Sequence, residues 1–448
     1  MNFSFDFVKN ITSLIFSYQI HFFLITALLL GVVRLILPYD YFIATGLIAL
    51  CILSYCLEIL TKARYRVNIL LTGVSRLLLG LFLFSILFSI LLTSKLDLPR
   101  SSYLVLLVSV NLYLLIFHLI SHVPDRKLNR FCLAIILFLT FLLILFASFA
   151  PFFTEFYPRK FSFIPEGIYK ILPPPKSIED GGFNPNYFPS LIVILLPMSL
   201  VWWLFPKTQE LPGWLKWLTL VGVVVSSFIL ILLQARASLI GVSISFLILL
   251  ILRVSPSIKL LLKLIFILLP ILVFIFIYPE SIQSILRALG NPFGYTFIER
   301  SRQWFYGWLM LNDFMFTGSG IVEKSIIVHL FYPRLNVEEF SLVYFHNVFF
   351  EIVADVGILA LISWLSLWGT ASIGAWFAYR SHHSLLSALG AALLAVQGGV
   401  FVHQLFEAQV WVDLKASLLF WLLWGVAMGV GFRAKCLEKS ERSGGVES

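Results

Sequence analysis

Charged side chains are scarce in this chain. Asp, Glu, Lys and Arg together account for 12% of the 448 residues, whereas hydrophobic residues account for 60%. A soluble globular protein carries about 25% charged residues. The composition therefore excludes an ordinary soluble enzyme, a disordered protein and a nucleic-acid-binding module, and it requires lipid as the surrounding solvent. The net charge of +9 lies mostly between apolar runs, where membrane topology accounts for it.

Cysteine is also rare, and two familiar sequence signals are missing. The long polar stretches at 151–188 and 279–345 contain none of the four cysteines, which predicts no structural disulfide there and no thiolate metal site. The chain has no glycine-rich loop of the nucleotide-binding type, which argues against ATP drive. The segment Met1–Tyr18 lacks the basic flank and cleavage site of a signal peptide, so we expect the first span to be retained.

What the sequence does contain is a series of apolar runs of membrane-spanning length. Each helical span needs about 20 apolar residues, and isolated strands would leave backbone groups unsatisfied in hydrocarbon. We therefore predict an all-α, polytopic integral membrane protein of about twelve transmembrane helices with a helical loop domain outside. The predicted spans are 18–37, 39–60, 68–94, 102–122, 131–150, 189–205, 214–233, 237–252, 258–278, 346–370, 384–404 and 413–432.

The basic residues of the short loops predict the orientation of these spans, because Lys and Arg are enriched on the cytoplasmic side. Sixteen fall on one side and three on the other, which predicts that both termini are cytoplasmic. The three are Lys95, Arg100 and Arg236; the sixteen are Lys62, Arg64, Arg66, Arg126, Lys127, Arg130, Lys207, Lys216, Arg253, Lys259, Lys263, Arg380, Arg433, Lys435, Lys439 and Arg442.

This topology divides the chain into five parts. We predict N-terminal transmembrane helices with a first outer loop (1–188) and central helices with the Arg236 hairpin (189–278). A large outer loop (279–345), C-terminal helices (346–432) and a cytoplasmic tail (433–448) follow. Within the large loop, Ser281–Leu289 and Phe297–Asn312 show helical spacing and are expected to lie on the outer membrane surface.

Several polar residues fall in one plane on the outer side. Arg236 occupies a tight hairpin between two spans, Arg300 and Arg302 begin the aromatic surface helix, and His346 and Asn347 lie where the chain re-enters the membrane. The planar fork of arginine binds phosphate oxygens bidentately, and a histidine can act as a general base. The alternative interpretation is structural: a single arginine there anchors lipid headgroups, and a single histidine caps a helix.

Three short motifs contain these polar residues. They are Arg300-Ser-Arg-Gln-Trp304 followed by Gly318-Ser-Gly320, His346-Asn347 followed after nine residues by Gly357, and the turn Gln234-Ala-Arg236-Ala-Ser-Leu239 between two spans. In this order they resemble the O-antigen ligase and O-antigen polymerase superfamily of membrane glycosyltransferases. Two positions depart from the usual pattern of that family: Met315 stands where proline is usual, and Ala360 stands at the last position of the second motif.

The resemblance implies a transferase in the bacterial inner membrane with a periplasmic active site. The donor would be a glycan linked to undecaprenyl diphosphate, and the acceptor would be a sugar hydroxyl of the lipid A core. No metal or other cofactor is implied, no nucleic acid takes part, and we expect a monomer among membrane lipids. His346, Arg236 and Arg300 would be catalytic, and the transfer would invert the anomeric carbon. Arg302, Arg34, Asn347 and Trp304 would contact the substrates.

Other functions stay open at this point. An O-antigen polymerase uses the same donor, a protein O-oligosaccharyltransferase has a Ser or Thr acceptor, and a polysaccharide flippase or exporter would line a central cavity with cations. Arg34 and Arg76 lie within predicted spans, and such a small number of cations inside the bundle disfavours a flippase. His403 is the rival to His346 as the base. Glu351 and Asp355 are expected to pair with Arg34 or Arg76, because an unpaired charge inside a membrane bundle is costly.

Overall fold

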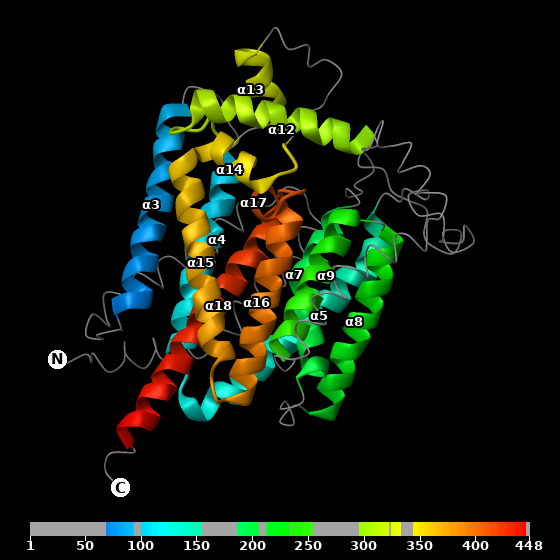
Figure 1. Cartoon of the computed structure of the whole chain (residues 1–448), viewed down its shortest axis with the longest axis vertical. Helices are drawn as coiled ribbons and strands as arrows, with labels where there is room; N and C mark the ends of the chain where they lie inside the picture. The colour runs from blue at the N-terminus through cyan, green and yellow to red at the C-terminus, as the bar shows by residue number, and fades with distance from the viewer. Residues whose placement is uncertain are drawn as a thin grey trace, which may run out of the picture.

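The computed structural model describes residues 69–93, 100–154, 186–205, 212–233, 235–253, 295–321, 324–332 and 344–444. This part of the chain is a bundle of long helices with shorter helices across one end (Figure 1). Seven of its helices are long and apolar enough to cross a membrane, counted over these residues alone. The chain is an all-α, multi-pass membrane protein, as predicted.

Nine helices correspond to predicted spans. They are α3 (Ile69–Thr93), α4 (Arg100–Ser121), α5 (Asp125–Phe153), α7 (Tyr187–Leu204), α8 (Gly213–Leu233), α9 (Arg236–Arg253), α15 (Ile358–Tyr379), α16 (Ser384–Gln404) and α18 (Leu414–Gly444). The predicted spans 18–37, 39–60 and 258–278 and the predicted surface helix Ser281–Leu289 lie outside the described residues. The total of twelve spans therefore stays a prediction.

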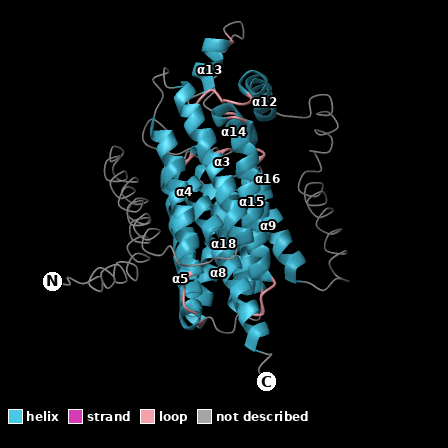
Figure 2. Ribbon diagram, turned by 90° about the vertical axis from the view of Figure 1, so that its left-hand side faces the viewer, coloured by secondary structure: helices cyan, strands magenta, loops and turns pink. Residues whose placement is uncertain are grey.

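The shorter helices lie at one end of the bundle. The predicted surface helix 297–312 is confirmed as α12 (Tyr295–Phe314), which crosses this end at a steep angle to the long helices (Figures 1 and 2). Two short helices that we did not predict, α13 (Lys324–Phe331) and α17 (Gln409–Val412), lie at the same end. A small apolar core of Met310, Ile327, Val328, Phe345 and Ala354 holds α12 and α13 against the segment that precedes α15.

The prediction of one helix over 346–370 was wrong. The structure has two helices there, α14 (Val348–Val356) and α15, separated by Gly357. Gly357 has a φ of 87°, a conformation that side-chain-bearing residues rarely adopt, and a Cβ on it would lie 2.5 Å from the carbonyl oxygen of Phe316. The break is therefore imposed by another segment, the turn that follows α12.

This turn, residues 315–320, joins α12 to the break between α14 and α15. Ser319 N donates to Ala354 O (2.6 Å) and Gly320 N to Asp355 O (3.0 Å), while Ile358 N donates to Met315 O (2.6 Å). Gly318 has a φ of 65°, and a Cβ on it would collide with the backbone of Asp355. The two glycine motifs that are far apart in the sequence thus meet in one backbone junction, which fixes α12 relative to α14.

Gly318→Ala is expected to destabilise this junction, because the new methyl group meets rigid backbone and the positive φ is unfavourable for alanine. We expect a loss of about 1–3 kcal/mol in unfolding free energy, measured as a lower thermal midpoint in detergent. Gly369→Ala is the matched control, since Gly369 lies in α15 with open space around its Cα. Equal thermal midpoints for the two variants would contradict the role of Gly318 in holding this junction together.

Small residues let α9 and α16 approach closely. A Cβ on Gly241 would lie 2.9 Å from the carbonyl oxygen of Gly399, and Ser245 Oγ donates to Ala395 O (2.9 Å). In lipid, helices associate through such close packing and interhelical hydrogen bonds because there is no water to expel between them. The contact fixes the start of α9 against the last turns of α16.

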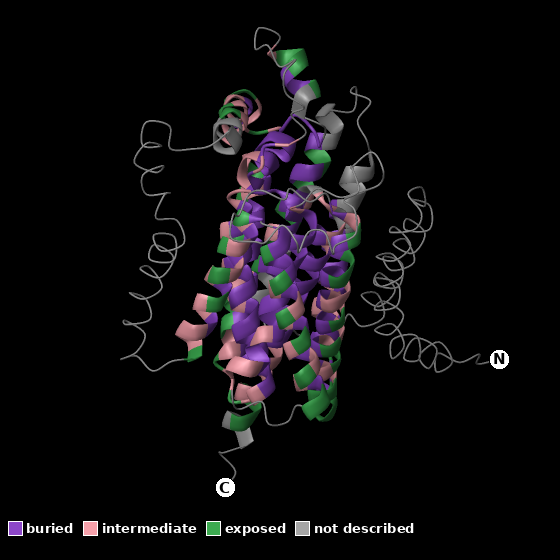
Figure 3. Cartoon of the chain, turned by 90° about the vertical axis from the view of Figure 1, so that its right-hand side faces the viewer, coloured by how far each residue is buried: buried purple, intermediate pink, exposed green. Residues whose placement is uncertain are grey.

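The centre of the bundle is aromatic. Trp364, Trp421, Trp424 and Phe420 are buried and pack together with ring centroids 4.8–6.2 Å apart. Large apolar residues such as Leu77, Val224 and Ile362 are exposed on the outer faces of the helices, where lipid would cover them. Figure 3 shows the corresponding distribution, with buried residues concentrated along the axis of the bundle.

Candidate functional site

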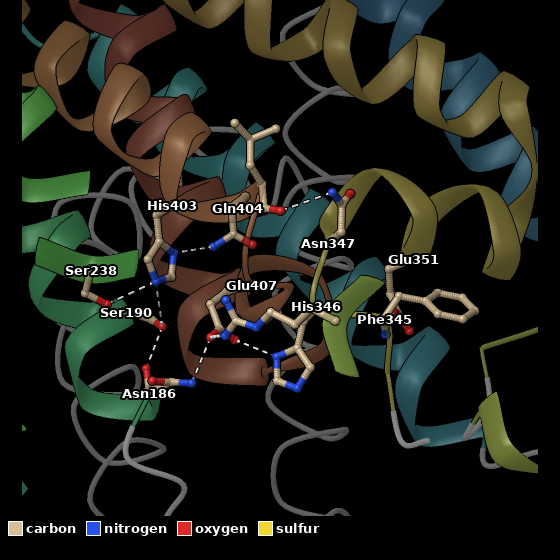
Figure 4. Close-up of polar contacts among 12 residues, drawn as sticks. Asn186, Ser190, Ser238, Phe345, His346, Asn347, Glu351, His403, Gln404 and Glu407 are labelled. Carbon is tan, nitrogen blue, oxygen red and sulfur yellow. Dashed lines mark hydrogen bonds and ion pairs between the residues drawn. The ribbon is translucent and has the colours of Figure 1, made fainter. Parts of the chain in front are cut away.

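A buried carboxylate collects three polar side chains at the end of the bundle below α12. Glu407 is fully buried in the link between α16 and α17. Its Oε1 lies 2.8 Å from Arg300 Nη2 and accepts a hydrogen bond from Asn186 Nδ2 (2.8 Å), while its Oε2 lies 3.1 Å from His346 Nδ1. Figure 4 shows Glu407 between Asn186 and His346. We call these four residues the Glu407 cluster.

Each member of the Glu407 cluster comes from a different element. Asn186 precedes α7, Arg300 lies on α12, His346 precedes α14, and Glu407 follows α16. The contacts join residues separated by 61 to 221 positions in the sequence. Assembly of the cluster therefore depends on the whole end of the bundle, and no short motif contains it.

The charges around Glu407 keep its carboxyl ionised. Burial by itself would raise the pKa of Glu407, but the hydrogen bond with His346 and the nearby charge of Arg300 hold this pKa below its ordinary value. Tyr344 lies beside the cluster with its ring centroid 4.3 Å from that of His346. Burial and the neighbouring Glu407 raise the pKa of the Tyr344 hydroxyl, so Tyr344 stays protonated near neutral pH.

The backbone around His346 is held in an unusual conformation. His346 has a φ of 52°. Among the described residues, it is the only residue other than glycine with a positive φ. Asn347 caps α14, since its Oδ1 accepts from Phe349 N (3.0 Å) and Phe350 N (3.3 Å), and its Nδ2 donates to Leu405 O (3.1 Å). Glu351 Oε2 accepts from Phe345 N (2.8 Å). A strained backbone conformation of this kind persists where several surrounding contacts hold it in place, which often occurs at functional sites.

His346 presents one nitrogen to Glu407 and keeps the other accessible. Its side chain is 21% exposed, compared with 1% for the carboxylate partner. Within the described part of the chain, Nε2 makes no hydrogen bond. When Nδ1 donates to a carboxylate, the lone pair of a neutral imidazole is on Nε2. The ring can therefore accept a proton from a molecule that arrives at the exposed side.

The other predicted site residues that the structure describes lie outside the Glu407 cluster. Arg236 begins α9 and is exposed, and it has no hydrogen bond or ion pair with another described residue. Arg302 is exposed on α12. Trp304 packs beside Phe406 in the link that carries Glu407, with ring centroids 6.4 Å apart. Arg34 lies outside the described residues.

The structure thus joins Arg300 and His346 through Glu407 and uses Asn347 to hold the backbone beside them. It places Arg236 at the same end of the bundle, because Ser238, two residues later, contacts His403 Nε2 (3.1 Å) on α16. Sequence reasoning missed Glu407 and Asn186. A signal for Glu407 was present: a carboxylate between two spans, with no lysine or arginine beside it in the sequence, needs a distant partner.

The two acidic residues of α14 each accept a hydrogen bond from a described residue, and their predicted pairing with Arg34 or Arg76 stays untested. Glu351 accepts from the backbone at Phe345, as described above, and Asp355 Oδ2 accepts from Trp411 Nε1 (2.6 Å). Both are buried. The predicted partner Arg34 is outside the described residues, and the side chain of Arg76 is not described. The observed contacts tie α14 to the His346 segment at one end and to α17 at the other.

In the part of the chain that the structure describes, no three His, Cys, Asp or Glu side chains are grouped so as to hold a metal ion. Two arginines at this end could bind an anion. Arg300 uses one of its five N–H donors on Glu407, and Arg236 is exposed.

Fold and site together define a multi-pass membrane protein with a polar, charged site at one end of its helical bundle. Residues 221–365 match the family model described as O-antigen ligase. This match confirms the resemblance to the O-antigen ligase superfamily and indicates a glycosyltransferase-like protein of the ligase or polymerase type. The matched region includes Arg236, Arg300 and His346 and ends before Glu407. No curated protein matches the chain.

Proposed function

We propose that the protein transfers a glycan from undecaprenyl diphosphate to a sugar hydroxyl of the lipid A core, at the periplasmic face of the bacterial inner membrane. The observation that carries this proposal is the Glu407 cluster, which holds an accessible imidazole beside a guanidinium at one end of the bundle. A nucleophile to deprotonate and an anionic leaving group to stabilise are the two requirements of such a transfer.

His346 acts as the general base in this proposal. Its Nε2 takes the proton of the acceptor hydroxyl while the acceptor oxygen bonds to the anomeric carbon of the donor. The bond from that carbon to the phosphate oxygen breaks, and undecaprenyl diphosphate leaves with the electron pair. This single displacement inverts the anomeric configuration. Glu407 orients the ring and stabilises the imidazolium that forms, as a carboxylate does beside a catalytic histidine in other enzymes.

Arginines stabilise the diphosphate. Arg300 is fixed by Glu407, which leaves its other N–H groups available to the leaving oxygen. Glu407 offsets one positive charge, so a second cation is needed to bind a diphosphate well. Arg236 is exposed and unengaged among the described residues, and it supplies that charge from the start of α9. Arg302 on α12 and Trp304 line the approach of the substrates.

A periplasmic location of the site is supported by the distribution of cations along the described helices. At the end away from the site, α9 ends at Arg253, Arg380 follows α15, and α18 extends through Lys435. An excess of Lys and Arg marks the cytoplasmic ends of spans. The site then faces the periplasm, where the lipid-linked donor and the lipid A core are both presented.

A flippase or exporter is less consistent with the distribution of charge inside the bundle. Among the residues whose burial is described, no Lys or Arg is buried, whereas the buried acidic residues Glu351, Asp355 and Glu407 all lie toward one end. A conduit for a charged glycolipid would need cations along its length. A site at one end suits a transferase that leaves the polyprenyl chain in lipid.

Arg236→Ala is expected to lower the rate of transfer by about 10²–10³-fold, the usual cost of removing one group that stabilises developing negative charge. Arg236→Lys should restore little, because an ammonium does not replace a bidentate fork. Arg253→Ala is the matched control, since Arg253 is an exposed arginine at the other end of the same helix. Equal rates in Arg236→Ala and wild type, measured on membranes with matched protein levels, would remove Arg236 from the mechanism.

A deletion strain complemented with this chain tests the proposed function. Lipopolysaccharide separated on a gel should change from core-only to core with long glycan when the wild-type chain is expressed. Core with a single repeat unit in the deletion strain would instead indicate a polymerase. No difference between the complemented and deletion strains would contradict both activities.

A further inference from the structure

A second polar network lies next to the Glu407 cluster, inside the bundle. It is centred on His403, in the last turn of α16, whose side chain is almost fully buried. His403 Nε2 lies 3.1 Å from Ser238 Oγ of α9 and 3.5 Å from Ser190 Oγ of α7, and its Nδ1 lies 2.9 Å from Gln404 Nε2. Figure 4 shows these contacts on the side of Glu407 away from His346.

His403 is poorly placed to act as a base. It is 1% exposed, and within the described residues its hydrogen-bond partners are two hydroxyls and one amide. A substrate hydroxyl would have to replace these partners to reach the ring. An imidazole in this setting connects helices, because buried polar groups need such partners to offset the loss of water.

The helices that His403 connects carry the separate parts of the site. Ser238 is two residues from Arg236, and Glu407 is four residues after His403. Ser190 Oγ also donates to Asn186 O (2.7 Å), and Asn186 Nδ2 donates to Glu407. Hydrogen bonds therefore run from the Arg236 hairpin through His403 and Ser190 to the Glu407 cluster. The close packing of Gly241 on Gly399 lies directly below this network.

We propose that His403 is a positioning residue that fixes the Arg236 hairpin relative to the Glu407 cluster, so that the exposed arginine reaches the same diphosphate as Arg300. This inference rests on the proposed function. The Arg236 side chain has no anchor of its own among the described residues, so its location depends on the backbone of α9. Misplacement of a catalytic group by about 1 Å can cost about 10²-fold in rate.

The test compares two substitutions of His403 that differ in whether the new side chain can form a hydrogen bond. His403→Phe keeps a large ring but removes both nitrogens, whereas His403→Gln places an amide where Nε2 was and can still bond Ser238. His383→Gln is the matched control, because His383 is the histidine that caps the start of α16, at the end of this helix far from the hairpin. Ser238→Ala removes the partner on α9.

Hydrogen–deuterium exchange of the 233–241 backbone in detergent gives a readout that needs no activity. We expect exchange about fivefold to tenfold faster in His403→Phe and Ser238→Ala, and close to wild type in His403→Gln and His383→Gln. Transfer rates at varied donor concentration should fall in the same order, with a higher KM for the donor in His403→Phe. The double variant His403→Phe with Ser238→Ala should be no worse than the worse single variant.

The proposal would be overturned by wild-type exchange in His403→Phe, or by a His403→Gln variant that is as impaired as His403→Phe. Faster exchange with an unchanged KM and rate would also overturn it, since the hairpin would then be free to move without consequence. If the wild-type protein transfers no glycan, the proposed function fails, while the exchange data still report separately whether His403 holds the hairpin.

Discussion

Glu407→Gln is expected to reduce glycan transfer by about 10³–10⁴-fold, comparable to the loss of the carboxylate that orients a catalytic histidine. The amide keeps the size of the side chain but removes the charge that orients His346 and pairs with Arg300. The loss should appear in kcat. The rate of transfer from lipid-linked donor, measured with purified protein, checks this expectation.

Glu438→Gln is the matched control, because Glu438 forms an exposed pair with Lys435 near the end of α18 and its substitution should leave the transfer rate unchanged.

The pH dependence of stability gives a second check on the role of Glu407. Because the pKa of Glu407 is lowered in the folded protein, its carboxylate stabilises the fold above the ordinary glutamate range, and this stabilisation is lost as the pH falls through the lowered value. The difference in thermal midpoint between wild type and Glu407→Gln should therefore be largest near neutral pH and shrink on acidification. A difference that is constant with pH would contradict the ionised cluster.

His346→Ala is expected to reduce transfer by about 10²–10⁴-fold, the usual contribution of a general base. The fold should tolerate the change, because the His346 side chain is partly exposed. Donor binding should change little, since the arginines remain. The rate measured at saturating donor, together with protein level in the membrane, checks both parts.

His329→Ala serves as the control for His346→Ala. His329 is an exposed histidine on α13, at the same end of the bundle but outside the Glu407 cluster. We expect it to retain wild-type transfer. If His346→Ala is as active as His329→Ala, the acceptor proton goes elsewhere and His346 has no part in the reaction.

The long apolar helices could be predicted from the sequence because each span needs a run of a fixed length. α16 begins and ends at the predicted residues, and α12 is two residues longer at each end than its apolar spacing indicated. The break at Gly357 could not be predicted in this way. It depends on a backbone contact with the turn after α12, about 40 residues earlier in the chain, and hydropathy does not report such a contact.

The candidate site could be predicted in part. Arg300 and His346 could be predicted because polar side chains at the membrane boundary are costly unless they have a partner or a function. The structure joins the two residues through Glu407. Glu407 and Asn186 were missed because their importance comes from distant partners, which a single sequence does not display. Asn347 was expected to bind substrate, but its amide and carbonyl are used to cap α14 and to hold Leu405. Its predicted contact with substrate stays untested.

We propose that one end of this bundle is a glycosyl transfer site built around Glu407, His346 and the arginines. Purified protein in lipid nanodiscs, mixed with undecaprenyl-diphosphate-linked glycan and lipid A core, tests it most directly. We predict release of undecaprenyl diphosphate in step with glycosylated core, at a rate that falls at least about 10²-fold in His346→Ala and Glu407→Gln but not in His329→Ala. Release that is absent from the wild type, or equal in all four proteins, would contradict a transfer site at this end of the bundle.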